Sequence, residues 1–260
     1  MTTMKAMHQE FEPPEALRTT IKCFWHNVRE FDGPSFEVVP DGYAEIIFTF
    51  GGDCGVSCNG LVRALPSPFL MGLLNQPVVF STQSRLQVIG VRCYPWTVFD
   101  LLGLPPGKDG LRVFEHPVAQ LQSTLDVFMT AGRVDRAVAA LAAYFLAARP
   151  PKPVDATLFK AGAAMLEANG AMPVSEVAAA AHATVRTLER KFKHSSGHTV
   201  KDVSGLMRFE QARNRLWTEP DVSLAALAQA LGYTDQSHLS REFKRYCGVT
   251  PSAFARKRKR

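Results

Sequence analysis

One stretch of the chain, residues 235–246, carries polar side chains that could read DNA bases. Leu239, Phe243 and Tyr246 recur at intervals of four and three, which places them on one face of a helix. The opposite face carries Gln236, Ser237, Ser240, Arg241 and Lys244. Arginine pairs with guanine, glutamine with adenine and serine with either base, so this face has the chemistry that a helix in the major groove needs. An amphipathic surface helix with a solvated polar face would show the same pattern.

The pattern occurs a second time upstream, which favours DNA reading over a merely solvated face. Leu188, Arg190, Phe192 and Gly197 each lie 51 residues before a residue of the same type in the later stretch. Farther upstream the offset is 50, so the second copy has one extra residue in its turn. Each copy is predicted to be a helix–turn–helix unit. In the first copy we expect a buried stripe of Val185, Leu188 and Phe192, and an outward face of Arg186, Glu189, Arg190 and Lys193.

A long helix is predicted between the two units, from residue 199 or 200 to about residue 217. At 1.5 Å per residue, its roughly 18 residues span about 27 Å. Successive major-groove faces on one side of a duplex are about 34 Å apart. We therefore expect this helix to place two recognition helices in adjacent segments of the groove.

Positive charge is confined to the part of the chain that contains the repeat. Residues 151–260 hold 18 Lys and Arg against 10 Asp and Glu, whereas residues 1–150 hold 12 against 14. A basic module joined to a nearly neutral one is typical of a protein that binds a polyanion. Three prolines within residues 149–153 cannot continue a helix, so we place the domain boundary there, between residues 1–150 and residues 151–260.

The first domain is predicted to be rich in β-structure, which makes the fold class α+β. Short segments rich in Val, Ile and Phe are separated by Gly, Pro and Asp, as in strands joined by tight turns. The predicted strands are residues 23–28, 36–39, 45–50, 55–58, 77–80 and 86–92. Strands this short and closely spaced favour a barrel or a sandwich, which can enclose a small ligand. Five aromatic residues could line an effector pocket or form ordinary core, namely Phe48, Phe50, Phe80, Tyr94 and Trp96.

Helices are predicted to follow the strands, over residues 96–102, 118–129 and 134–148. The last has the clearest apolar stripe, formed by Val134, Val138, Leu141, Phe145 and Ala148. This stripe could pack against its own domain or form the interface of a homodimer.

The sequence contains little that points to catalysis. Of the five cysteines, Cys54 and Cys58 are close enough in sequence to suggest a redox pair or two metal ligands. No nucleophile elbow, phosphate-binding loop, dinucleotide fingerprint or zinc-protease motif occurs. We therefore expect no enzyme activity, cofactor or metal. The chain shows no secretion signal and no apolar run that could span a bilayer, so we expect a cytoplasmic protein without a membrane partner.

Residues 155–257 resemble the DNA-binding domain of the AraC/XylS family of transcription regulators. The resemblance rests on a pattern in the second unit, formed by Gly232, Tyr233, Asp235, Ser237, His238, Leu239, Arg241, Phe243, Lys244, Gly248, Thr250 and Pro251. It implies seven helices, with two helix–turn–helix units joined by a linker helix. It also implies regulation of transcription by sequence-specific binding to double-stranded DNA, with RNA polymerase as a partner if the protein is an activator.

The resemblance further implies roles for individual side chains. Base contacts would come from Arg186, Glu189 and Arg190 in the first unit, and from Gln236, Ser237, Ser240 and Arg241 in the second. Phosphate contacts, which position a protein without reading sequence, would come from Thr184, Lys193, Thr234, His238 and Lys244. The basic tail, residues 256–260, would add charge near phosphate.

Two residues depart from the family pattern, both in the first half of this domain. His182 stands where the first turn usually has glycine, and a positive φ there would cost about 1 kcal/mol. Gly205 lies inside the linker helix and would weaken it by roughly 0.5–1 kcal/mol. Ahead of the domain, residues 38–52 and 89–103 resemble the sensor domain of some family members, which is often a cupin-like barrel that binds a small effector.

Three functions remain open from the sequence. The first is a transcription factor regulated by a small effector. The second is a DNA-directed enzyme or a redox switch that uses Cys54 and Cys58. The third is an adaptor whose DNA-binding domain has lost its function.

Overall fold

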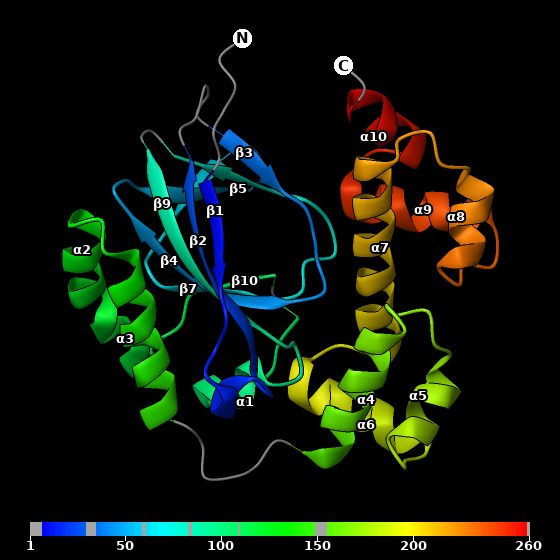
Figure 1. Cartoon of the computed structure of the whole chain (residues 1–260), viewed down its shortest axis with the longest axis horizontal. Helices are drawn as coiled ribbons and strands as arrows, with labels where there is room; N and C mark the ends of the chain where they lie inside the picture. Colours follow the sequence, from blue (N-terminus) through cyan, green and yellow to red (C-terminus); the bar gives the residue numbers. More distant parts are fainter. Residues whose placement is uncertain are drawn as a thin grey trace.

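The N-terminal half of the molecule is built from two antiparallel sheets (Figure 1). The computed structural model describes residues 7–29, 35–58, 61–82, 85–108, 110–148 and 155–258. One sheet has the strand order β1-β2-β9-β4-β7-β10 and the other the order β3-β8-β5-β6. The strands are β1 (Met7–Phe11), β2 (Ile21–Arg29), β3 (Ser35–Val38), β4 (Ala44–Phe50), β5 (Cys54–Cys58), β6 (Leu61–Leu65), β7 (Phe69–Met71), β8 (Val78–Ser81), β9 (Leu86–Cys93) and β10 (Leu111–Arg112).

The predicted α+β class and the β-rich first domain are therefore confirmed. Each of the six predicted strands is present, and β1, β6, β7 and β10 go beyond the prediction. Within the described residues the two sheets stay separate, so the domain is an open sandwich and does not close into one barrel.

Both faces of the six-stranded sheet are covered, which explains why every residue of its central strand β4 is buried. Ile46 and Phe48 point to one face, where they join a core that includes Leu141 and Phe145 from a helix. Ile47, on the alternate face, joins a second core that includes Phe80 of the other sheet. Alternation along the strand thus sorts neighbouring residues into two different cores.

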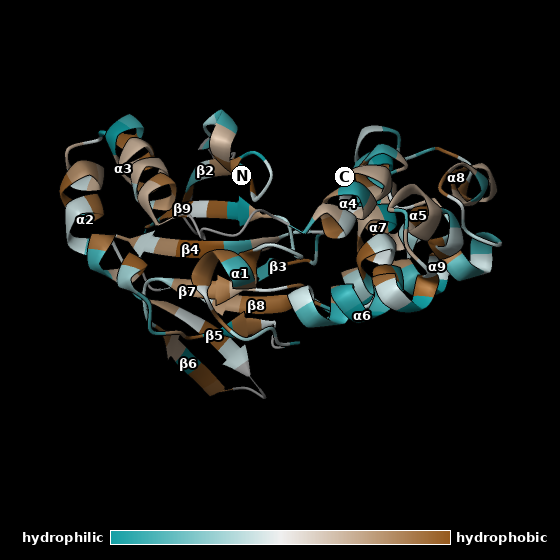
Figure 2. Cartoon of the chain, turned by 90° about the horizontal axis from the view of Figure 1, so that it is seen from below, coloured by the Kyte–Doolittle hydropathy of each residue, from teal (hydrophilic) through white to brown (hydrophobic). Residues whose placement is uncertain are grey.

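Short helices cover the outer face of the six-stranded sheet. They are η1 (Glu15–Leu17), α1 (Val98–Leu102), η2 (Pro117–Leu121), α2 (Gln122–Thr130) and α3 (Val134–Ala147). Figure 2 shows α2 and α3 above this sheet and β5, β6 and β8 below it. Val138, Leu141 and Phe145 are buried in this core, so most of the predicted stripe packs against its own domain.

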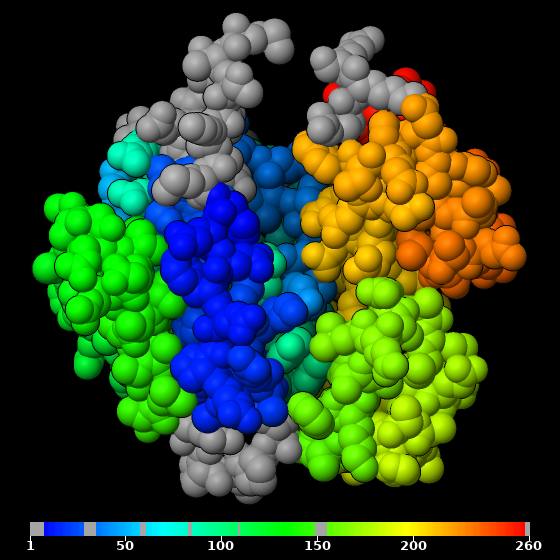
Figure 3. Space-filling model, in the orientation of Figure 1, coloured from blue at the N-terminus to red at the C-terminus, as the bar shows by residue number. Residues whose placement is uncertain are grey.

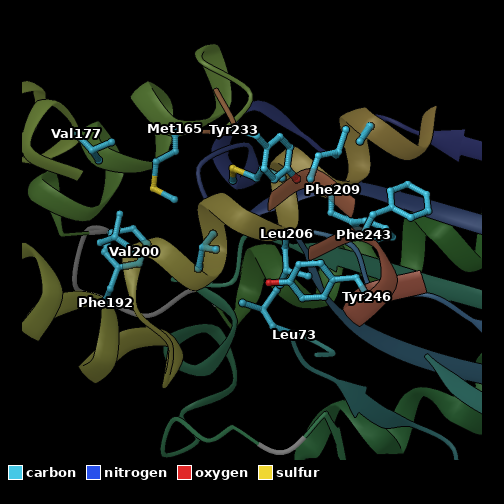
Figure 4. Packing of buried hydrophobic residues seen from close by; sticks show 14 of the residues in the cluster. Leu73, Met165, Val177, Phe192, Val200, Leu206, Phe209, Tyr233, Phe243 and Tyr246 are labelled. Atoms are coloured by element: carbon cyan, nitrogen blue, oxygen red, sulfur yellow. The ribbon is translucent and has the colours of Figure 1, made fainter. Parts of the chain in front are cut away.

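Residues 155–258 form seven helices, as predicted. They are α4 (Ala156–Glu167), α5 (Val174–Ala180), α6 (Val185–Ser196), α7 (Val200–Thr218), α8 (Leu224–Ala230), α9 (Gln236–Cys247) and α10 (Pro251–Arg258). The long helix α7 supplies the centre of the core, because Val203, Leu206 and Phe209 on it are 3% exposed or less. The Phe209 ring lies 5.1 Å from that of Phe243 and 5.2 Å from that of Tyr246. Figure 4 shows these side chains within the buried cluster. No helix in the described parts of the chain is both long and apolar enough to cross a membrane.

One hydrophobic cluster contains residues from both halves of the molecule. Leu73 and Trp96, from the N-terminal half, are buried in the same cluster as Leu206, Phe192 and Tyr246. The rings of Trp96 and Phe192 are 5.8 Å apart, and Figure 3 shows the two halves in contact along one seam. The predicted linker, residues 149–153, lies outside the described residues, so the domain boundary stays a prediction.

Candidate nucleic-acid interface

Helices α6 and α9 repeat one design. Each has 12 residues and ends at a left-handed glycine, Gly197 with φ 76° and Gly248 with φ 74°. Leu188 and Phe192 on α6, and their counterparts Leu239 and Phe243 on α9, are 0% exposed. The predicted duplication is therefore present in the structure, with the apolar side of each helix fixed in the core and the polar side outward.

The N-terminal end of each helix is fixed by a side-chain cap. The Thr184 hydroxyl oxygen accepts a hydrogen bond from the Thr187 amide at 3.2 Å. One Asp235 carboxylate oxygen accepts from the His238 amide at 2.7 Å. In helix–turn–helix proteins, the first residues of the recognition helix contact base edges. The caps therefore hold in place the part of each helix that would reach the groove.

The turns before the two helices have the same backbone conformation although their residues differ. His182 has a φ of 50° and Gly232 a φ of 70°. In both turns the next residue donates to a carbonyl five positions back, from Ala183 to Ala178 and from Tyr233 to Ala228, each at 2.9 Å. His182 thus adopts the left-handed conformation that is usual for glycine at this position of the turn.

Most of the residues predicted to contact bases are exposed, and two are half-buried. Arg186 and Arg190 on α6 are exposed, as are Gln236, Ser237 and Arg241 on α9. Glu189 and Ser240 are half-buried. One oxygen of Glu189 accepts a hydrogen bond from the Val200 amide at 3.3 Å, which places this carboxylate at the start of α7.

Val185 differs from its predicted place. The sequence pattern predicts a buried position, but Val185 is 43% exposed because it is the first residue of α6 and precedes the packed turns. It lies 51 residues before Gln236, the first residue of α9, so the two occupy equivalent positions. The offset of 51 residues in the repeat could have identified Val185 as the counterpart of Gln236.

The residues predicted to contact phosphate are mostly exposed. Thr184, Lys193, Thr234 and Lys244 are exposed, while His238 is half-buried. The His238 ring stands edge-on to that of Tyr233 at 5.3 Å, and its Nε2 lies 3.9 Å from a carboxylate oxygen of Glu242. His238 therefore has packing contacts of its own beside any contact with DNA.

Helix α7 is continuous over 19 residues and is tied to both units. Its start carries a reciprocal cap between Thr199 and Asp202. Arg208 donates to the Gly170 carbonyl at 3.0 Å and approaches Glu242 of α9 at 3.5 Å. At Gly205 a Cβ atom would lie 3.3 Å from the Tyr246 hydroxyl, so the glycine lets α9 pack closely. The linker is thus rigidly attached despite its glycine.

An ion pair joins the first unit to helix α4. Asp155 caps α4 by accepting from the Thr157 amide at 2.9 Å, and it also pairs with Lys191 of α6. Partial burial would raise the pKa of Asp155, but the Lys191 and amide hydrogen bonds outweigh burial and lower it. The charge on Lys191 is therefore engaged within the domain rather than offered to DNA.

A cavity of about 190 Å³ lies between the two sheets of the N-terminal domain. Its walls are largely apolar and include Ile47, Phe69, Phe80, Leu86 and Val88. Its polar lining residues include Asn27, Asp41, Glu45, Thr49 and Arg92.

Four of the five aromatic residues predicted for an effector pocket lie elsewhere. Phe80 lines the cavity. Phe48 and Phe50 point to the opposite face of β4 and pack under the helices. Tyr94 and Trp96 follow β9 and pack against the C-terminal core. These four residues have the core positions that the sequence left open as the alternative, because composition cannot tell which face of a strand meets the cavity.

Family comparisons agree with the geometry of the C-terminal domain. Residues 177–257 match a family described as "Helix-turn-helix domain", and residues 9–108 match one described as "Domain of unknown function (DUF6597)". HTH-type transcriptional regulator RipA from Corynebacterium diphtheriae is 33% identical over 109 residues, which cover 41% of this chain and 32% of that protein. Uncharacterized transcriptional regulatory protein YesN from Bacillus subtilis is 34% identical over 71 residues, 27% of this chain and 19% of that protein.

Two solved structures align with the chain at lower identity. ToxT from Vibrio cholerae, bound to an unsaturated fatty acid, aligns with a TM-score of 0.49 and 13% identity over 94% of this chain and 96% of its own. The DNA-binding domain of AdpA in complex with a target DNA aligns with a TM-score of 0.35 and 25% identity, over 40% of this chain and 92% of that one. The chain spans about a third of the length of RipA, and less of YesN. The C-terminal domain is therefore a helix–turn–helix domain of the AraC type, similar to the domains of these transcription regulators.

Proposed function

We propose that this protein is a transcription regulator that binds a specific double-stranded DNA sequence through α6 and α9. One observation supports this above the others. Two helices, each with a side-chain cap, a buried leucine and phenylalanine and exposed arginines, both contact one continuous helix, α7 (Figure 1). At 1.5 Å per residue, α7 is roughly 28 Å long, close to the spacing of about 34 Å between adjacent major-groove faces.

Arginines carry the strongest expected base contacts. Arg190 and Arg241 occupy equivalent, exposed positions, and each could bind a guanine through two hydrogen bonds. Gln236 suits adenine, while Arg186, Ser237 and Ser240 would complete the polar readout. The methyl groups of Val185 suit the 5-methyl group of thymine. Glu189, whose carboxylate already accepts from α7, would orient the helix as well as face the bases.

Phosphate contacts would surround these positions. Thr184, Lys193, Thr234, His238 and Lys244 lie on or beside the two helices and would fix the register of the protein on the duplex. Such contacts release counterions, so affinity would fall as salt rises.

The position of the cavity supports control by a small effector. Asp41 lines it, and the adjoining turn touches α7. A Cβ atom on Gly42 would lie 3.2 Å from Met207 of α7, and Arg213 of α7 approaches the Pro40 carbonyl at 3.5 Å. An occupant that moves this turn would shift the helix that sets the spacing of the two recognition helices. A homodimer, RNA polymerase as a partner and a cytoplasmic location would fit such a regulator.

Genome-wide binding of the full-length protein tests the DNA assignment. The double variant Arg190→Ala, Arg241→Ala should lose the wild-type binding sites. The control is Arg136→Ala, which removes an exposed arginine from α3 and should leave the sites unchanged. If the double variant keeps its sites, α6 and α9 do not read the bases. If the wild-type protein selects no DNA, the result favours the hypothesis of an adaptor whose DNA-binding domain has lost its function.

The alternative function, a redox switch at Cys54 and Cys58, has weak geometric support. Both residues belong to strand β5, so their Cα atoms are separated by about 13 Å along an extended chain. A disulfide requires less than about 7 Å between Cα atoms. Burial also raises the pKa of Cys54 to about 11, which keeps its thiol protonated. The Cys58 side chain lies outside the described part of the structure.

A further inference from the structure

The cavity between the sheets has polar ends and an apolar middle. Its floor comes from β2, β9 and β4, whose side chains form rows across the three strands. From one end to the other, the rows are Arg92–Glu45, Trp25–Gly90–Ile47 and Asn27–Val88–Thr49. A Cβ on Gly90 would lie 2.1 Å from the Trp25 indole, so the glycine lets this ring lie over the middle row. An occupant would therefore have an apolar body between two polar groups.

The volume limits the size of that body. A cavity of about 150 Å³ lined by apolar side chains is large enough to bind benzene. The present cavity, at about 190 Å³, has room for one aromatic ring or a comparable apolar group with a short side chain.

Carboxylates outnumber cations at the Glu45 end. Glu45 is 2% exposed, and its Oε1 accepts from Arg92 Nε at 2.7 Å and from Trp25 Nε1 at 3.0 Å. Arg92 is shared with Asp41 at 3.4 Å and with Glu10 at 3.8 Å. One guanidinium thus serves two carboxylates that line the cavity and a third beside it. The His8 ring also lines the cavity, and its Nε2 lies 3.2 Å from the third carboxylate, that of Glu10, so the carboxylates still outnumber the cationic groups. Buried charges are normally paired, so this end lacks positive charge.

The raised pKa of Glu45 agrees with the shortage of positive charge at this end of the cavity. Burial raises the pKa of Glu45 to about 6 even though Arg92 and Trp25 donate hydrogen bonds to it. A second cation beside this carboxylate would stabilise its charged form. An anion placed there would meet Glu45 and Asp41 instead.

At the other end of the cavity, a side-chain oxygen of Asn27 has no hydrogen-bond donor among the described residues. Asn27 lines the cavity and is 8% exposed, and its Oδ1 has no hydrogen-bond partner among the described residues. A buried acceptor without a partner is costly, so a group that donates to it would be bound favourably. Both ends of the cavity therefore suit an occupant that donates hydrogen bonds, and the Glu45 end suits one that is positively charged.

We propose that the cavity binds a small organic cation, with a protonated amine at Glu45 and Asp41 and an apolar body of about one aromatic ring along Ile47 and Val88. The wider role of this compound as the effector rests on the proposed function, whereas its binding does not. Organic anions of the same size are excluded by the same carboxylates.

A series of three compounds with one body and different head groups tests the charge preference. 2-Phenylethylamine, 2-phenylethanol and phenylacetate are titrated into the full-length protein by calorimetry. The amine should bind at least about tenfold more tightly than the alcohol, and the alcohol more tightly than the carboxylate. Equal affinities, a preference for the carboxylate or no binding of the amine at millimolar concentration would overturn the proposal.

Two variants locate the site. Glu45→Gln keeps an oxygen acceptor for Arg92 and Trp25 but removes the charge, so it should weaken amine binding about tenfold and leave alcohol binding unchanged. Val88→Phe adds a ring in the row next to the middle of the cavity, where the apolar body would lie, and should abolish binding of both compounds. Glu12→Gln removes a carboxylate that is 87% exposed and should change neither. Unchanged amine binding in Val88→Phe would place the compound elsewhere and overturn the assignment. The head-group series on the wild-type protein decides the proposal even if Glu45→Gln does not fold.

DNA affinity, measured on the same preparations with and without the amine, separates this proposal from the proposed function. Amine binding without any DNA binding would support the cation site and contradict the proposed regulator function. DNA binding without amine binding would support the regulator function and contradict the cation site.

Discussion

The indole of Trp96 occupies the space that a side chain on Gly162 would need. A Cβ atom built on Gly162 would lie 2.1 Å from Cζ2 and 2.5 Å from Cε2 of Trp96. Trp96 follows the sheet of the N-terminal domain, whereas Gly162 lies in the middle of α4, where glycine is unfavourable for the helix itself. The glycine is therefore explained by the contact between domains and not by the needs of α4.

Replacing Gly162 by valine should destabilise the protein by about 1–3 kcal/mol, because the new side chain must displace a buried indole. Chemical denaturation of the full-length chain measures this. Ala163→Leu adds volume at the next position, which is exposed, and should have little effect. A Gly162→Val variant as stable as the wild type would show that the two domains do not pack as described.

Lysine contacts with phosphate should appear in the salt dependence of DNA binding. The logarithm of affinity should fall linearly with the logarithm of salt concentration, and Lys193→Ala and Lys244→Ala should each reduce the slope by about 1. Both variants should weaken binding to all sequences alike. Lys22→Ala, which removes an exposed lysine from the N-terminal sheet, serves as the control. An unchanged slope in both variants would remove these lysines from the interface.

Val185 should read a thymine. In a selection from random DNA, Val185→Ser should relax the preference at one base pair by about 1 kcal/mol, because the apolar contact with the thymine methyl group is lost. Val113→Ser, at a valine that is 45% exposed in the N-terminal domain, should leave the selected sequence unaltered. A Val185→Ser variant that selects the wild-type sequence at full strength would place Val185 outside the groove.

Buried histidine should make stability depend on pH. His26 is 2% exposed, and burial lowers its pKa below the ordinary value of 6.5. The unfolded chain takes up this proton near pH 6.5, while the folded chain does so only at lower pH. Stability is therefore full above pH 6.5 and falls as the pH drops below it, by at most about 1.4 kcal/mol per pH unit for one proton.

Denaturation of His26→Gln between pH 5.5 and pH 7.5 isolates the contribution of this histidine, since the wild type should lose more stability than the variant as pH falls. Parallel curves for the wild type and His26→Gln would contradict a buried, neutral His26.

The thiol of Cys54 should be inert in the folded protein. Burial raises its pKa to about 11, and the thiolate is the reactive form. After brief alkylation at pH 8, peptide mapping should find Cys54 unmodified in the native chain and modified in the denatured one. Rapid native modification, or loss of regulation in Cys54→Ser, would revive the redox hypothesis.

The recognition helices could be predicted because their signal is local. Leu188 and Phe192 recur at helical spacing, and the second copy at Leu239 and Phe243 confirmed the period within the sequence itself. Val185 fits the same period yet is exposed, because a residue at the start of a helix can lie beyond the elements that bury its later turns. Periodicity predicts the face of a helix but not how far along the helix that face is covered.

The cavity could not be predicted to the same degree. Ile47 and Phe48 are adjacent, buried and apolar, yet one lines the cavity and the other packs under helices on the far side of the sheet. The choice depends on which layer covers which face, and that is fixed by contacts between segments far apart in the chain. The contact of Trp96 with the C-terminal domain is of the same kind.

The position of Trp96 gives the protein an optical reporter of its own domain contact. The indole is 3% exposed and stacks with Tyr94 at 5.4 Å, and indole emission moves to longer wavelength when water reaches the ring. The two other tryptophans lie at the cavity, Trp25, and near the end of α7, Trp217. With phenylalanine at those two positions, the fluorescence spectrum would report from the seam alone. Separation of the domains on addition of DNA could then be followed in real time, without an attached dye.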